Sequence, residues 1–319
     1  MRKTTMKRRL CLAQINYLDH DASRHEERLR QIIAENRTAD LIVFPELILH
    51  GHPSKEKPEG FLYRKMERRR EVHLSERMYR FVREMDARVI MGEIKRKGEM
   101  FYNLATYMDR DMVRSYVKTH VHWTENFIPG NELPVFSTPV GNIGMTICFD
   151  AAFVEVGRIL ALRGADIIVN ISAVPKSFAV DYMWRRLAGM AINNQVFAIY
   201  VNRPGGYFAG HSAVFDPRGN LTAAAGNDEE ILLTEIDLEE IDAWREKENI
   251  YGYRRPRLYR EIEKTDSLKT AARRLTVAGR RYELQLQLTP PERRDHGRHP
   301  RQESVLPHSL AEASRQEDG

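Results

Sequence analysis

The stretch Leu41-Ile42-Val43-Phe44-Pro45-Glu46-Leu47 decides the class of fold. Its four consecutive apolar residues predict a short strand that is buried on both faces of a sheet. Pro45 ends this strand, because proline has no N–H to donate to a central ladder. Glu46 follows directly at the strand end. Taken alone, such a carboxylate is more often a solvated loop residue or a helix cap.

Two other expected strands end in a residue that can carry chemistry. Lys118 follows the segment Met112–Val117, and Cys148 follows Ile143–Ile147. In open α/β sheets, strand ends are where rigid elements direct side chains into a crevice. A carboxylate, an ammonium and a thiol so placed form a candidate site. The alternatives are a surface lysine and a small buried cysteine. We interpret the other cysteine, Cys11, as such a core residue.

Strands and helices alternate along the rest of the chain. Ser23 and Glu26 have the spacing of a capping box, and the apolar positions that follow predict a helix. Asp109-Arg110-Asp111 predicts a tight hairpin. Further helices are expected at Met78–Met85, Val154–Leu162 and Met183–Asn193. Further strands are expected at Leu10–Ile15, Val89–Gly92, Asn103–Met108, Ile167–Ile171, Phe197–Val201, Ser212–Phe215 and Ile231–Ile236. This mixture predicts an α/β fold with mixed sheets.

The pattern divides the chain into three parts. Residues 1–9 form a basic lead, 10–264 a single catalytic domain, and 265–319 a C-terminal extension that we expect to be largely disordered or to form an interface. Within the extension, only Arg281–Leu288 keeps a strand-like alternation.

Composition narrows the range of functions. The 319 residues carry 50 basic and 45 acidic side chains, a near balance that does not require a nucleic-acid partner, and arginines do not interleave with aromatic residues as in base-stacking proteins. The basic start precedes an apolar run that is too short for a signal peptide, and no stretch is long enough to span a membrane. Two cysteines cannot build a disulfide framework. We therefore expect a cytoplasmic protein without a membrane or nucleic-acid partner.

Together, the three strand ends resemble the signature blocks of the nitrilase superfamily of carbon–nitrogen hydrolases. The resemblance extends from about Leu10 to Leu258. It rests on LIVFPEL, YVKTH followed by ENFIPG, and GMTICFD followed by GADIIVN, with AINNQVFAIYVNR, GHSAVFDPRGN and ILLTEIDLEEID further on. The family implies a four-layer α-β-β-α sandwich and assembly into homo-oligomers. It also implies the catalytic residues Glu46, Lys118 and Cys148, and a further active-site glutamate at Glu125.

The expected roles follow from acid–base chemistry. A free thiol has a pKa near ~8.5, so Cys148 needs a base within hydrogen-bond reach, and Glu46 suits this role. Lys118 suits the stabilisation of an oxyanion, with the backbone N–H of Phe149 as second donor. Ser172 and Ala173 are further candidate substrate-binding residues. The histidines show no metal-ligand spacing. We expect neither a metal nor another cofactor.

The substrate is less well defined by the sequence. Phe149-Asp150 is similar to the amidase-like branch, whereas nitrile-hydrolysing relatives usually have Trp-Glu there. Ala151 and Ala152 stand where relatives that cleave N-carbamoyl amino acids often carry arginines. These features favour a neutral or amine-bearing, non-peptide amide of a small molecule. The alternatives are an N-carbamoyl amino acid or amine amidohydrolase, a nitrilase, the amidase half of a glutamine-dependent enzyme, and a catalytically silent scaffold.

Overall fold

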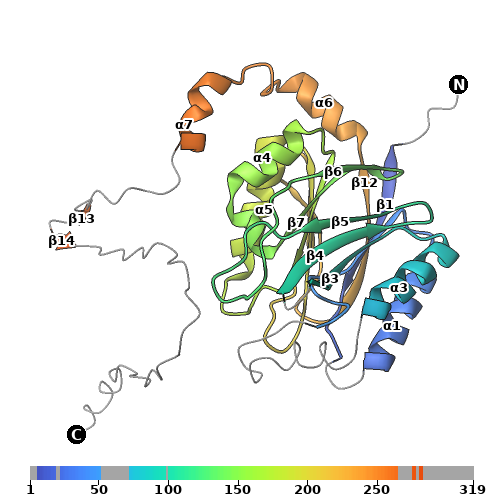
Figure 1. The fold of residues 1–319 in the computed structure, drawn as a ribbon. Coiled ribbons are helices and arrows are strands. Elements are labelled where there is room, and N and C mark those ends of the chain that lie inside the picture. Colours follow the sequence, from blue (N-terminus) through green and yellow to red (C-terminus); the bar gives the residue numbers. More distant parts are fainter. Residues whose placement is uncertain are drawn as a thin grey trace, which may run out of the picture. The chain divides into compact units, whose positions relative to one another are not determined.

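The computed structural model describes residues 6–18, 22–51, 72–97, 100–264, 275–277 and 280–282. The chain divides into two compact units, Met1–Tyr253 and Arg254–Gly319. Most of the first unit is built from two six-stranded sheets and the helices that cover them (Figure 1).

The first sheet has the strand order β12-β1-β2-β3-β4-β5. Its strands are β1 (Lys7–Gln14), β2 (Leu41–Val43), β3 (Val89–Lys97), β4 (Met100–Met108), β5 (Val113–Val117) and β12 (Glu230–Asp237). Strands β1, β2 and β3 are parallel, and β4 and β5 follow as antiparallel neighbours. Because two antiparallel steps restore the direction, β5 runs the same way as β2. The carboxyl ends of β2 and β5 therefore lie at the same edge of the sheet.

The second sheet has the strand order β11-β10-β9-β8-β7-β6. Its strands are β6 (Val135–Thr138), β7 (Gly141–Ile147), β8 (Ile167–Ser172), β9 (Phe197–Asn202), β10 (Ala213–Phe215) and β11 (Leu221–Ala224). Strands β7, β8 and β9 are parallel. The two sheets stack face to face, with β4 against β7 and β1 against β9.

Three apolar clusters occupy the three interfaces of a four-layer α-β-β-α sandwich. The central cluster joins the two sheets and includes Val43, Tyr107 and Ile147. A second cluster packs the first sheet against α1 (Ala22–Glu35) and α3 (Val72–Met85). A third packs the second sheet against α4 (Val154–Leu162) and α5 (Val180–Asn194). Figure 1 shows these helix pairs on opposite sides of the sheets. The expected fold is thus confirmed.

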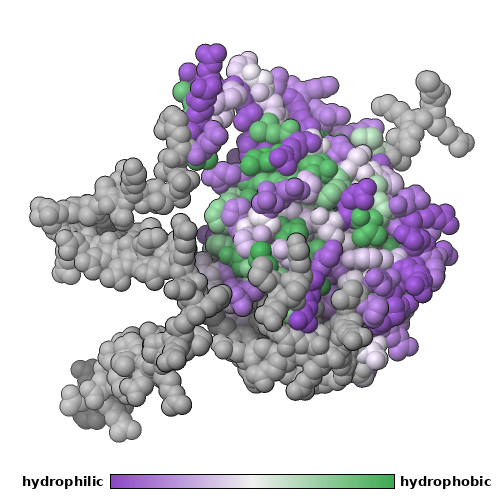
Figure 2. All heavy atoms as spheres, in the orientation of Figure 1, coloured by the Kyte–Doolittle hydropathy of each residue, from purple (hydrophilic) through white to green (hydrophobic). Residues whose placement is uncertain are grey.

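The helices form where apolar residues recur at helical spacing. In α1 the buried positions are His25, Leu29, Ile32 and Ile33, which share one face. Ser23 lies inside α1, because the helix already includes the residue before it. The expected capping box at Ser23 is therefore wrong. Figure 2 shows hydrophilic side chains over the outer surface of α1 and α3, as expected for amphipathic helices.

Strand bounds differ from the expected ones mainly where a partner strand extends the ladder. The first strand begins at Lys7 instead of Leu10, because Lys7 pairs with Asp237 of β12. Likewise β3 continues past Gly92 to Lys97, where it pairs with the beginning of β4. Several elements have no counterpart in the sequence pattern that we recognised, among them β6, β11 and α6 (Glu239–Lys247). The hairpin at Asp109 is confirmed by its N–H bond to Met112 O.

In the described residues of the second unit, the chain forms two short helices and a hairpin. These are the 3₁₀ helix η2 (Pro256–Tyr259), α7 (Arg260–Lys264), and the antiparallel pair β13 (Leu275–Val277) and β14 (Arg280–Tyr282). Arg281 and Tyr282 of the expected strand-like segment lie in β14, and the rest of it lies outside the described residues. None of the helices in the described part of the chain is long and apolar enough to cross a membrane.

Candidate active site

Glu46 lies in the turn that follows β2 and is completely buried. Its Oε1 accepts hydrogen bonds from Asn103 Nδ2 at 2.7 Å and from Lys118 Nζ at 2.9 Å. The next residue, Leu47, has a φ of 52°, a left-handed conformation that an L-residue adopts only where the surroundings impose it. The turn is therefore held in one shape, with the carboxylate directed at Lys118 and Asn103.

Gly92 of β3 provides the space for this turn. A Cβ at Gly92 would lie 2.2 Å from Leu47 N, 2.5 Å from Pro45 O and 2.7 Å from the carbonyl carbon of Glu46. All three are backbone atoms, which cannot move aside as a side chain can. The close approach also allows Leu49 N to donate to Gly92 O at 3.1 Å. A residue without a side chain is thus required beneath Glu46.

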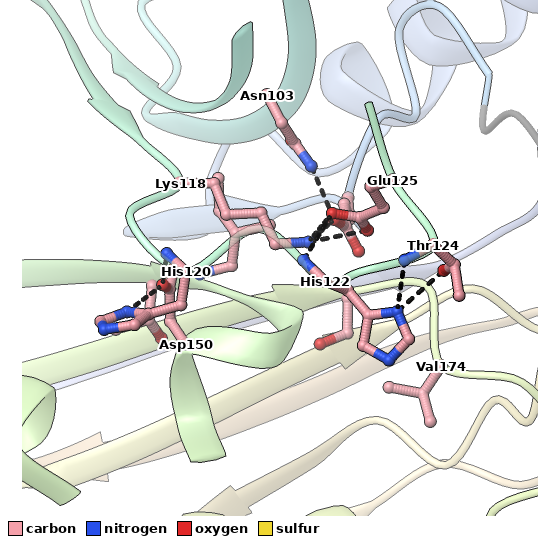
Figure 3. A network of polar contacts seen from close by, with 12 residues as sticks. Asn103, Lys118, His120, His122, Thr124, Glu125, Asp150 and Val174 are labelled. Atoms are coloured by element: carbon pink, nitrogen blue, oxygen red, sulfur yellow. Dashed lines mark hydrogen bonds and ion pairs between the residues drawn. The ribbon is translucent and has the colours of Figure 1, made fainter. Parts of the chain in front are cut away.

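Lys118 lies at the carboxyl end of β5, and its backbone N–H donates to Asn103 O at 2.9 Å. Its Nζ contacts Glu46 Oε1 at 2.9 Å, Glu125 Oε1 at 2.9 Å and Glu125 Oε2 at 2.8 Å (Figure 3). Burial by itself would lower the pKa of this ammonium. Neighbouring negative charges, that of Glu46 first and that of Glu125 with it, outweigh burial and raise the pKa of Lys118 above its ordinary value. Lys118 is therefore a permanently charged, buried cation.

Glu125 stands in the loop that follows β5. Its backbone N–H donates to His122 O at 2.8 Å, and its Oε2 accepts from His122 N at 3.3 Å. Burial, assisted by the charge of Glu46, raises the pKa of Glu125 in spite of the opposing effect of Lys118. The loop returns through Gly130, whose N–H donates to Lys118 O at 2.8 Å. Both ends of the loop are thus attached to the lysine.

Cys148 directly follows β7 and begins the 3₁₀ helix η1 (Cys148–Ala152). Its φ is 47°, so the nucleophile candidate sits on a sharp, strained turn. The side chain is partly buried. Burial, with the charges of Glu46 and Glu125, raises the pKa of the thiol; Lys118 and a hydrogen bond from the backbone N–H of Ala173 act in the opposite direction. At neutral pH the resting group is therefore a thiol.

Asp150 connects the cysteine turn to the lysine loop. Asp150 is fully buried. Its carboxylate accepts hydrogen bonds from the N–H of Ile147 at 2.9 Å and from the hydroxyl of Tyr116 at 2.7 Å. It also accepts from Thr119 Oγ1 at 3.0 Å and from the N–H of His120 at 2.8 Å. These donors come from both sheets. Asp150 thus holds Cys148 and Lys118 in a common frame.

The structure brings Glu46, Lys118, Glu125 and Cys148 together. Of the proposed substrate-binding residues, Ala173 directs its N–H at Cys148. Ser172 is buried, and its hydroxyl donates to Asn170 Oδ1 at 2.7 Å, so its side chain is engaged within the second sheet.

Sequence reasoning missed Asn103, Gly92 and the structural role of Asp150. A polar residue at the start of an expected apolar strand was the available signal for Asn103, and a glycine inside a strand was the signal for Gly92. Among the residues that the structure describes, no group of three or more His, Cys, Asp or Glu side chains is arranged to hold a metal ion.

Comparison with known proteins identifies the class. The model of the carbon–nitrogen hydrolase family matches residues 9–246, so the chain belongs to this family. It is an enzyme that hydrolyses carbon–nitrogen bonds, as expected from the resemblance to the nitrilase superfamily.

Individual relatives carry different activities. The chain is 29% identical to a nitrilase of Pyrococcus abyssi, over 70% of this chain and 86% of that protein. It is 28% identical to an (R)-stereoselective amidase of a Pseudomonas species, over 73% of this chain and 86% of the relative. The crystal structure of a carbon–nitrogen hydrolase from Helicobacter pylori superimposes with a TM-score of 0.73 at 22% identity, covering 81% of this chain and 98% of that chain. This last likeness concerns the fold.

Proposed function

We propose that this enzyme cleaves a non-peptide amide of a small molecule through a covalent acyl intermediate on Cys148. The observation that carries the proposal is the Lys118 ammonium, which bridges the carboxylates of Glu46 and Glu125 beside the thiol. A base, a cation and a nucleophile within one buried cluster are the groups that acyl transfer from nitrogen requires.

In the first half of the reaction, the Cys148 sulfur attacks the amide carbon while Glu46 takes the thiol proton. The raised pKa of Cys148 makes this transfer necessary, because little thiolate is present before attack. The negative charge that develops on the substrate oxygen is stabilised by the Lys118 ammonium and the backbone N–H of Phe149. Collapse of the tetrahedral intermediate breaks the C–N bond. Glu46 returns its proton to the nitrogen, which leaves as ammonia or an amine.

In the second half, water attacks the thioester carbon and Glu46 takes a proton from the water. The C–S bond breaks, the sulfur recovers its proton, and the carboxylic acid leaves. Glu125 has a positioning role in both halves, because its two oxygens hold Lys118 Nζ at 2.8 and 2.9 Å and its charge helps to keep the amine protonated.

Three arginines bear on the choice between neutral and carboxylate-bearing substrates. Arg158 Nη2 donates to Asn193 O within the outer helix layer, and Arg185 forms an exposed ion pair with Asp181. Arg203, at the end of β9, is buried and donates through Nε and Nη2 to the side-chain oxygen of Asn16. These engagements, together with Ala151 and Ala152, support a neutral or amine-bearing amide as substrate.

Release of ammonia by the full-length protein tests the proposal. We expect propionamide to be hydrolysed with a higher kcat/KM than propionitrile or N-carbamoyl-β-alanine. Mass spectrometry of acid-quenched enzyme should detect an added propionyl group on the peptide that contains Cys148. Turnover of the nitrile alone, or a strong preference for the carboxylate-bearing ureide, would overturn the amide assignment. An intact protein that acts on none of them would favour the silent scaffold.

We also propose that the protein forms homo-oligomers. Apolar side chains gather on the surface over α4 and α5 (Figure 2). They are the exposed residues Val154, Ile159, Leu162, Val180 and Ile192. Grouped exposed apolar residues of this kind are typical of subunit contacts. Light scattering should give a mass above that of one chain, and Ile192→Glu should reduce it. A monomeric wild type would contradict the proposal.

A further inference from the structure

Five aromatic rings connect the loop after Lys118 to the turn that carries Cys148. His120 stacks on Phe153 at 3.8 Å, Phe153 meets Phe149 edge to face at 5.3 Å, and Phe149 meets His122 at 5.0 Å and Trp123 at 5.7 Å. Residues from the loop and from η1 thus interleave. The reaction proposed above uses only the backbone of Phe149 and none of these rings.

Trp123 differs from the other four rings, because 79% of its surface is exposed. One of its faces stacks on His122 at a centroid distance of 3.8 Å. The ring plane of Phe149 stands at 87° to that of Trp123 and at 86° to that of His122. Trp123 and Phe149 therefore form the two walls of a right-angled aromatic corner, one wall of which is open to solvent.

The loop holds Trp123 in this position. The residue before it, His122, exchanges backbone and side-chain bonds with Glu125, and the residue after it, Thr124, donates its N–H to His122 Nδ1 at 3.3 Å. Figure 3 shows the His122 and Thr124 side chains turned toward each other beside Glu125. The hydrogen bonds that position Glu125 thus also hold the Trp123 ring exposed to solvent.

The two residues of the corner are also close in sequence to the candidate catalytic residues. Phe149 directly follows Cys148, and Trp123 stands two residues before Glu125, which contacts Lys118 Nζ. A planar group attached to a substrate carbonyl by a short chain would stack on one wall and meet the other edge-on. Such aromatic pairs add about 0.5–1.5 kcal/mol to the gain from apolar burial.

We propose that Trp123 and Phe149 form a specificity subsite that selects amides bearing an aromatic ring a few bonds from the scissile carbonyl. This inference rests on the proposed amidase function and names its substrate class. The alternative role for a single exposed tryptophan is a subunit contact. The ratio of kcat/KM values and the oligomer mass of a Trp123 variant distinguish a substrate subsite from a subunit contact.

The test compares two amides that differ by one ring. The kcat/KM values for 3-phenylpropionamide and propionamide are measured with full-length wild type, Trp123→Ala, Trp123→Phe and Tyr253→Ala. Tyr253 is the matched control, because it is an aromatic residue with 85% of its surface exposed and lies outside the corner.

We expect wild type to prefer the phenyl compound. Trp123→Ala should lower the ratio of the two kcat/KM values about tenfold, equivalent to ~1.4 kcal/mol. Trp123→Phe should keep most of the preference, and Tyr253→Ala all of it. An unchanged ratio in Trp123→Ala would overturn the subsite. If that variant also changed its oligomer mass while keeping the ratio, Trp123 would be a subunit contact instead.

The subsite can be judged even if the proposed function fails. If wild type releases ammonia from neither amide, the amidase assignment is wrong. Calorimetric titration with 3-phenylpropionamide then decides the subsite alone. Weaker binding by Trp123→Ala than by wild type supports it, and equal binding or no binding refutes it.

Discussion

Replacement of Gly92 by alanine tests whether the backbone beneath Glu46 determines activity. The added Cβ would approach Leu47 N to 2.2 Å and two other backbone atoms of the same turn to within 2.7 Å. The shortest of these distances is less by about 1 Å than non-bonded heavy atoms tolerate. Either the turn or β3 must therefore shift by a comparable amount, and Glu46 moves relative to Cys148.

Two magnitudes follow. Overpacking a rigid site typically costs about 1–3 kcal/mol in the free energy of unfolding. A displacement of about 1 Å at reacting groups lowers the rate by about a hundredfold. We therefore expect Gly92→Ala to remain folded but to lose about two orders of magnitude in kcat/KM for propionamide, measured by ammonia release alongside urea unfolding.

Gly189→Ala in α5 is the matched control. A Cβ there meets only Asn193 Nδ2, at 3.9 Å, which is ordinary contact. Within a helix this change should raise the free energy of unfolding by about 0.5–1 kcal/mol and leave activity unaltered. If Gly92→Ala retained activity within threefold of wild type, the turn would not control the position of Glu46.

Three further outcomes are expected. Cys148→Ala should abolish turnover in a folded protein, and turnover by this variant would refute the covalent mechanism. Cys11→Ala should keep most activity, because burial raises the pKa of Cys11 to about 12 and keeps it a thiol. Asn103→Ala removes a hydrogen-bond donor to Glu46 Oε1 and should lower kcat at least tenfold with little change in KM, measured by ammonia release. A change confined to KM would show that Asn103 acts on substrate binding. Burial and the neighbouring His25 lower the pKa of His50 to about 4. Above about pH 6.5 neither state protonates His50. Between about pH 6.5 and about pH 4 only the unfolded chain binds a proton at His50, so the free energy of unfolding falls by up to about 3 kcal/mol as the pH is lowered. Urea unfolding across this range should show a shallower loss for His50→Asn, and an equal slope would exclude His50 as the cause.

Local sequence patterns predicted the helices and strands that have buried faces, because burial requires apolar side chains at those positions. The strand before Glu46 and the helix Val154–Leu162 were predicted because continuous or periodic apolar residues report which faces are covered. The candidate residues Glu46, Lys118 and Cys148 were predicted by their place at strand ends and by the family resemblance. The structure adds the distances that join Glu46 and Lys118.

Contacts between distant segments were not predictable in the same way. Asn103 holds Glu46 from across the sheet, 57 residues away in sequence. Asp150, which follows a strand of the second sheet, accepts a hydrogen bond from Tyr116 on β5 of the first sheet. Nothing in the neighbourhood of either residue reports its partner. In β6 and β11 every residue is partly or fully exposed, so the apolar pattern of these strands was too weak to be recognised.

The placement of the site at the junction of two sheets has a consequence during synthesis. Glu46 and Lys118 follow strands that emerge from the ribosome early, whereas the cysteine turn and the Ala173 N–H that contacts it follow strands made later. A nascent chain that stops after β5 contains the base and the cation without a nucleophile. The thiol acquires its neighbours only when the second sheet docks on the first. Proximity of the thiol, the base and the cation therefore depends on packing between segments that are made early and segments that are made late.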